Sequence, residues 1–145
     1  MKLKKILITH SFLILLLCMC STCSTSPDYS RVFPATQDQV SRIKGGLNEK
    51  FVATNAYAIK SIGRIQVYFV ACNLNSKVRG GSSEVVAVWA MTGDSNASGM
   101  TLSMNQIAKE FWSGRFDQGI ESNVSMATEG AIIVEDFVKK KMFLK

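Results

Sequence analysis

The sequence predicts an α+β fold in which helices cover one face of a three-stranded antiparallel sheet. Two observations support this prediction. Apolar residues recur at helical spacing near both ends of the expected domain, and three segments between them are rich in β-branched and aromatic residues. The expected order is one N-terminal helix, three strands, and two C-terminal helices packed on one face of the sheet.

The first helix is expected over about residues 37–54. Thr36 and Gln39 have the spacing of a capping box, with Thr36 as the N-cap. One apolar stripe then follows at helical spacing: Val40, Ile43, Leu47 and Phe51. Gly45 and Gly46 interrupt this stripe, which permits a close crossing over a strand or marks a kink.

Three consecutive segments have the composition of β-strands. Residues 57–62 form a short candidate, and residues 64–74 form a longer one that is rich in β-branched and aromatic side chains. Residues 84–92 are nearly all apolar, which is expected of a strand that is covered on both faces or is central in the sheet. We expect these strands to pair as an antiparallel meander.

Two helices are expected in the last third of the chain. Ser103 and Gln106 repeat the capping-box spacing at the start of a short helix that ends near Trp112. A final helix is expected over about residues 126–142, with one apolar face: Ala127, Ala131, Val134, Val138 and Met142.

The N-terminal residues have the order of a secretory signal peptide. Three lysines precede the apolar run 6–17, and the small polar residues 21–26 follow it. We therefore expect a signal peptide over residues 1–22, a flexible tether over 23–35 and a single domain over 36–145. A signal anchor that is never cleaved is the alternative.

Three cysteines, Cys18, Cys20 and Cys23, lie directly behind the apolar run. Their spacing and position do not suit a metal or redox cluster, because Cys72 is the only cysteine downstream. Bacterial lipoprotein processing explains them better. Cys23 is the best lipidation candidate, since Ser21 and Thr22 are smaller than the residues directly before Cys18 and Cys20. Ordinary signal-peptide cleavage without lipidation remains an alternative.

Charge and composition exclude several function classes. Removal of residues 1–22 lowers the formal net charge from +6 to +3, which does not argue for nucleic-acid binding. The same removal takes away His10, the only histidine. The mature chain therefore lacks serine–histidine and cysteine–histidine catalytic sites and histidine-ligated zinc.

Other candidate sites have simpler structural explanations. Residues 94–99 resemble the start of an EF-hand loop, but Asn105 stands where the bidentate Glu is required. Cys72 is expected to be a small buried side chain. Gly80 and Gly81 lack the Lys-Ser/Thr of a phosphate-binding loop.

Four aromatic residues are expected in the core rather than around a ligand: Trp89, Phe111, Trp112 and Phe116. Six carboxylates are expected on the solvated surface: Glu110, Asp117, Glu121, Glu129, Glu135 and Asp136.

Three short segments suggest a family: "YFVAC" (68–72), "VWAMT" (88–92) and "NQIAKEF" (105–111). They resemble motifs of small secreted or lipid-anchored bacterial proteins of uncharacterised function, over roughly residues 38–140. The resemblance implies an envelope location and a compact domain, and it carries over no catalytic residue.

Together these features predict a non-enzymatic bacterial envelope lipoprotein that binds an envelope protein or a small ligand, without cofactor or metal. Its lipid anchor would hold it on the outer face of the membrane or in the periplasm. The alternatives are a freely secreted effector or exclusion-type protein, and a carboxylate-based hydrolase.

Overall fold

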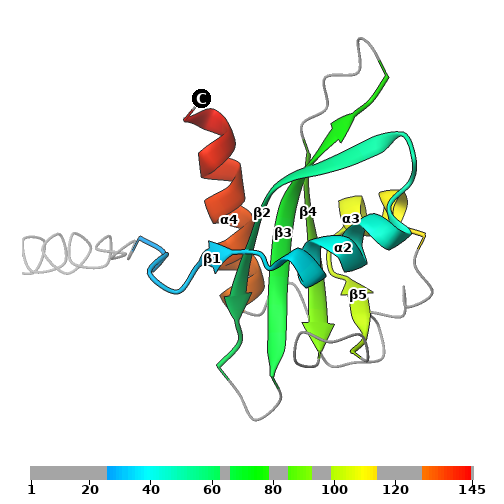
Figure 1. The fold of residues 1–145 in the computed structure, drawn as a ribbon. Helices are drawn as coiled ribbons and strands as arrows, with labels where there is room; N and C mark the ends of the chain where they lie inside the picture. The colour runs from blue at the N-terminus through cyan, green and yellow to red at the C-terminus, as the bar shows by residue number, and fades with distance from the viewer. Residues whose placement is uncertain (1–25, 63–65, 79–84, 93–98, 114–128, 145) are drawn as a thin grey trace, which may run out of the picture.

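Five antiparallel strands, adjacent in the order in which they follow one another along the chain, form the sheet of the computed structural model (Figure 1). The structure describes residues 26–62, 66–78, 85–92, 99–113 and 129–144. The elements in chain order are β1 (Phe33–Pro34), α2 (Gln37–Gly46), β2 (Phe51–Lys60), β3 (Val67–Ser76), β4 (Val85–Thr92), β5 (Thr101–Ser103), α3 (Gln106–Phe111) and α4 (Glu129–Phe143).

The α+β class is confirmed, but the predicted three-stranded sheet is wrong. The sheet gains β1 on the β2 edge and β5 on the β4 edge. Two- and three-residue strands are too short to produce an alternating pattern in the sequence. Pro34 also lies in β1, at the sheet edge, where a strand tolerates the missing backbone N–H.

The predicted N-terminal helix is also wrong. The strand β1 precedes α2, and α2 ends at Gly46, so residues 51–54 belong to β2 instead of a longer helix. The capping box of Thr36 and Gln39 is confirmed. Leu47 and Phe51 pack on the same core cluster as Ile43, although they lie in a connection and a strand. Their helical spacing therefore reflects a shared cluster and not a continuous helix.

Helices cover both faces of the sheet, which corrects the prediction of one covered face. Along β3, Phe69 and Ala71 belong to the core cluster that includes α4, whereas Val70, Cys72 and Leu74 belong to the cluster that includes α2 and α3. Because side chains alternate across a strand, a strand between two helical layers must be apolar on both sides. This explains the nearly continuous burial of β4, which the sequence predicted.

The short helix α3 is fixed to the sheet by Asn105 rather than by the predicted N-cap, Ser103. The Asn105 Oδ1 atom accepts hydrogen bonds from the backbone N–H of Ala108 at 2.9 Å and of Val88 at 3.2 Å. Its Nδ2 atom donates to the carbonyl oxygen of Val86 at 3.0 Å. One side chain therefore caps the helix and attaches it to β4.

Candidate functional site

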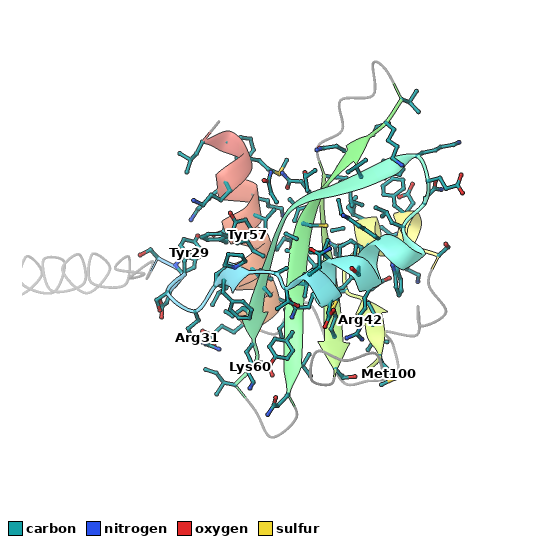
Figure 2. All side chains as sticks on the ribbon, in the orientation of Figure 1. Tyr29, Arg31, Arg42, Tyr57, Lys60 and Met100 are labelled. Carbon is teal, nitrogen blue, oxygen red and sulfur yellow. The ribbon has the colours of Figure 1, made fainter. Side chains whose placement is uncertain are left out.

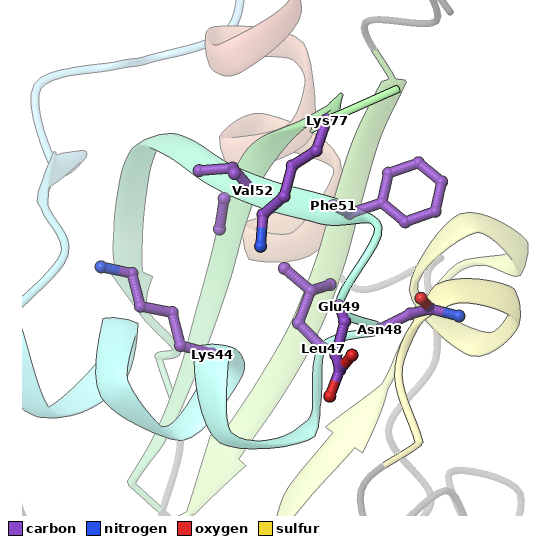
Figure 3. Close-up of a pocket in the computed structure, with 8 residues that line it drawn as sticks. Lys44, Leu47, Asn48, Glu49, Phe51, Val52 and Lys77 are labelled. Atoms are coloured by element: carbon purple, nitrogen blue, oxygen red, sulfur yellow. The ribbon is translucent and has the colours of Figure 1, made fainter. Parts of the chain in front are cut away.

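A pocket of about 320 Å³ lies where the end of α2 turns into β2 (Figure 3). Its lining combines two lysines, one acid, one amide and four apolar residues: Lys44, Leu47, Asn48, Glu49, Phe51, Val52, Ala53 and Lys77. In Figure 3, Lys44 comes from α2, and the Lys77 side chain reaches across the pocket from the opposite side. The pocket therefore combines apolar side chains with two ammonium groups and one carboxylate.

Backbone hydrogen bonds fix the turn that forms this pocket. The backbone N–H of Phe51 donates to the carbonyl oxygen of Asn48 at 3.0 Å. The backbone N–H of Asn48 donates to the carbonyl oxygen of Phe111 at 2.9 Å. The N–H of Lys77 donates to the carbonyl oxygen of Lys50 at 2.8 Å, which places Lys77 beside the turn. The Phe51 and Phe111 rings also pack with centroids 4.3 Å apart.

The charge of the pocket suits an anion. Among the residues that the structure describes, no carboxylate lies within ion-pair distance of the ammonium groups of Lys44 or Lys77. Val52 is partly exposed in this pocket, with an exposed fraction of 37%. A ligand with a negative group and an apolar part would suit this pocket. The negative group would contact the lysine ammonium groups, and burial of the apolar part against Val52 would contribute binding free energy.

A second polar cluster lies at the opposite end of the domain, where the N-terminal chain meets α4. The Tyr29 hydroxyl donates to the carboxylate of Asp136, and the Lys140 ammonium donates to the Tyr29 hydroxyl. Lys140 Nζ also lies 3.1 Å from the Asp136 carboxylate. The Tyr29 hydrogen bond, followed by the hydrogen bond and charge of Lys140, lowers the pKa of Asp136. Hydrogen bonds to Tyr29 and Asp136 raise the pKa of Lys140.

This cluster attaches the start of the described chain to the domain (Figure 2). The Tyr29 and Phe137 rings meet edge-on with centroids 5.4 Å apart, and Tyr57 packs against the same Phe137 ring at 4.8 Å. Arg31 donates to the carbonyl oxygen of Lys60 at 2.8 Å. Of the expected tether, residues 29–35 therefore contact the domain. Cys23, the predicted lipidation site, lies outside the described residues together with Cys18 and Cys20.

Arg42 is a third basic side chain with a defined environment, but its role is structural. Its guanidinium donates to the carbonyl oxygens of Gly99 at 2.5 Å and Met100 at 2.8 Å (Figure 2). Burial lowers the pKa of this guanidinium, with Asp38 opposing the effect. Arg42 thus attaches α2 to the chain just before β5.

Cys72 lies in the core, as predicted. It is fully buried among the side chains between the sheet and α2 and α3. Burial raises the pKa of its thiol to about 12, which keeps it protonated and unreactive at neutral pH. The structure therefore gives no support for a reactive thiol at this position.

The other sequence candidates lie in the core, on the surface or outside the described residues. Trp89 and Trp112 are buried, as expected, and the Trp112 indole N–H donates to the carbonyl oxygen of Ile43 at 3.0 Å. Within the described ranges, no group of three acidic, cysteine or histidine side chains could hold a metal ion. Other candidates lie outside the described residues: 94–98, Gly80, Gly81, Phe116, Asp117 and Glu121.

Comparison with protein-family models, with curated proteins and with solved structures gave no match. The resemblance to small envelope proteins of bacteria therefore stays a prediction.

Sequence reasoning missed the pocket residues Lys44 and Lys77. They are 33 positions apart, and each alone is an ordinary surface lysine. Only the pairing of β2 with β3, in which Phe51 lies opposite Ser76, brings them to the same turn. No local pattern in the sequence carries that register.

No helix within the described ranges is long and apolar enough to cross a lipid bilayer.

Proposed function

We propose that this chain is a non-enzymatic bacterial envelope lipoprotein. Acylation of Cys23 would hold the domain outside the cytoplasmic membrane, where the pocket between α2 and β2 would bind an anionic ligand with an apolar part. The basic n-region, the apolar run and the cysteine behind it support the anchor. The observation that carries the binding role is that Lys44 and Lys77 line a pocket with apolar side chains and have no ion-pair partner within the described part of the chain.

The arrangement of the domain is consistent with this role. In Figure 1 the N-terminal chain enters beside β1 and α4. The pocket is lined by Lys44 near the C-terminal end of α2 and by the residues that follow it. A domain anchored through its N-terminal chain would therefore keep the pocket on the side away from the anchor. Acyl chains provide sufficient attachment, because each buried methylene contributes about 0.8 kcal/mol to membrane binding.

Radiolabelled palmitate tests the anchor. We expect incorporation into the wild-type chain and loss of the label in Cys23→Ser, with Cys20→Ser retaining it. Label that persists in both variants would contradict the assignment of the anchor. Recovery of unlabelled protein from the medium without detergent would favour the freely secreted alternative instead.

Calorimetric titration with octanoate tests the pocket, with octanol as the uncharged counterpart and the full chain in neutral detergent. We expect octanoate to bind more tightly than octanol. The paired change Lys44→Gln and Lys77→Gln should weaken octanoate binding about tenfold, because it removes both cations. Lys60→Gln, at the other end of β2, is the matched control and should bind as the wild type does. Equal binding by all three proteins would contradict the proposed site.

A further inference from the structure

Two large apolar side chains are exposed at the last turn of α4. Phe143 is 87% exposed and Leu144 is 80% exposed, and only Met142 separates them from Lys139, Lys140 and Lys141. Lysines at the end of a helix compensate its dipole, which accounts for their presence. The helix dipole gives no reason for two adjacent exposed apolar residues, so this turn calls for a different explanation.

The lysines near the end of α4 have fewer carboxylate partners as the helix approaches its last residue. Lys139 pairs with Glu135 at 2.8 Å and Lys140 pairs with Asp136 at 3.1 Å. Lys141 has no such carboxylate partner among the described residues, and its ammonium lies 5.5 Å from the centre of the Phe137 ring. No acidic residue occurs in positions 137–145. The last turn therefore combines positive charge with exposed apolar surface.

The chain that leads to Cys23 leaves the domain beside this turn. Tyr29 packs on Phe137, and Phe143 lies six residues further along the helix, which is roughly 9 Å at the rise of an α-helix. Cys23 precedes Tyr29 by six residues, whose extended length is about 20 Å. A lipid attached at Cys23 would therefore hold the end of α4 within reach of the bilayer surface.

We infer that the last turn of α4 docks on an anionic phospholipid surface. Phe143 and Leu144 enter the interface between headgroups and acyl chains, while the ammonium groups of Lys139, Lys140 and Lys141 contact the phosphates. Basic residues next to aromatic and aliphatic ones are the composition that binds such interfaces. This inference rests on the proposed anchor for its place in the cell, but the contact itself can be measured separately.

A membrane fits this turn better than a protein partner does. Stable protein interfaces bury roughly 800 Å² on each side, with about 20 or more residues. Two adjacent apolar side chains at one helix end offer much less area. A bilayer needs no matching shape. The anchor would keep the end of α4 at a high local concentration near the bilayer, which supplies the remaining affinity.

Fluorescence quenching by brominated lipids tests the contact in the full chain, reconstituted in vesicles of phosphatidylcholine and phosphatidylglycerol. Phe143→Trp reports on the last turn of α4. Ile62→Trp is the matched control, because Ile62 is 82% exposed and follows the end of β2. Trp89 and Trp112 are buried and contribute the same background to both variants.

We expect bromination of the acyl chains to reduce the added fluorescence of Phe143→Trp roughly twofold and to leave Ile62→Trp nearly unchanged. Replacing phosphatidylglycerol by phosphatidylcholine, or Lys139, Lys140 and Lys141 by Gln, should diminish the quenching at position 143. Equal quenching of the two tryptophan variants would overturn the inference.

Mass spectrometry of the same reconstituted chain shows whether Cys23 carries lipid, so the docking and the anchor are tested separately. A chain that carries lipid at Cys23 but shows no quenching at position 143 overturns the docking and leaves the proposed anchor intact. A chain without lipid whose tryptophan at position 143 is quenched supports the docking and contradicts the anchor.

Discussion

The Tyr29 hydroxyl donates a hydrogen bond to the Asp136 carboxylate across 107 positions of sequence. This contact joins the first described residues to the last helix, next to the edge strand β1. Val32 packs into the same core cluster as α4, so the attachment continues past Tyr29. The N-terminal chain therefore enters the domain at a defined place beside α4.

Two substitutions of Tyr29 should weaken this attachment to different degrees. Tyr29→Phe removes the hydroxyl but keeps the ring, and we expect it to lower the free energy of unfolding by about 0.5 kcal/mol, because the partners are partly exposed. Tyr29→Ala also removes the ring packing on Phe137 and should cost about 2 kcal/mol. Urea unfolding measures both. Equal stability of Tyr29→Ala and wild type would show that the segment is not attached.

The same contact should depend on pH. Because the Tyr29 hydrogen bond and then the Lys140 charge lower the pKa of Asp136 in the folded state, its ionised form stabilises the fold above its ordinary pKa of 3.8. This stabilisation should disappear as the pH falls below 3.8 and through the lowered pKa. Lys140, whose pKa is raised from 10.5, remains cationic throughout this range.

Asp136→Asn measures that pH dependence. Its stability difference from the wild type should be present at about pH 7 and should shrink as the pH falls below 3.8 and through the lowered pKa of Asp136. In a Tyr29→Phe background the difference should be smaller, because the main cause of the pKa shift is gone. A stability difference that stays constant over the whole range would exclude ionised Asp136 as its source.

Alanine substitution of the two adjacent glycines of α2 should change the stability of the protein in opposite directions. A Cβ atom on Gly46 would lie 2.3 Å from the Trp112 indole nitrogen, which donates to the Ile43 carbonyl oxygen. Gly46→Ala should therefore cost about 1–3 kcal/mol. A Cβ atom on Gly45 meets nothing within 4 Å, so Gly45→Ala should be stabilising by about 0.5 kcal/mol. Thermal unfolding of the two variants checks their order, and the reverse order would contradict this packing.

The thiols of the mature protein should be inaccessible. Cys72 is fully buried with a pKa of about 12, and lipoprotein processing would remove Cys18 and Cys20 and acylate Cys23. Maleimide should therefore label no cysteine in the native mature protein and one after unfolding in denaturant. More than one labelled thiol after unfolding would indicate that the signal segment or a free Cys23 remains.

The sequence predicted β3 and β4 approximately, because their composition is rich in β-branched and apolar residues over many positions. It failed where the determining contacts are distant in sequence. The end of α2 depends on Gly46 meeting Trp112, and the N-cap of α3 depends on Asn105 bonding to β4. The allocation of α2 and α3 to one face and α4 to the other depends on packing between residues that are distant in sequence, which no local pattern encodes.

The candidate site was less accessible to sequence reasoning than the fold. Cys72 was correctly expected in the core, since it alternates with apolar residues in a strand. The pocket was missed because its lysines, Lys44 and Lys77, become neighbours only through the register of β2 and β3. The exposed Phe143 was missed because it lies beyond the predicted end of the final helix at residue 142, and exposure is not readable from the sequence.

The lipid anchor is tested most directly by mass spectrometry of the chain extracted from membranes with detergent. The predicted result is a mature protein that begins at Cys23 and carries a diacylglyceryl group on that cysteine. A mature protein that begins at another residue, or one that contains Cys23 without lipid, would contradict the anchor.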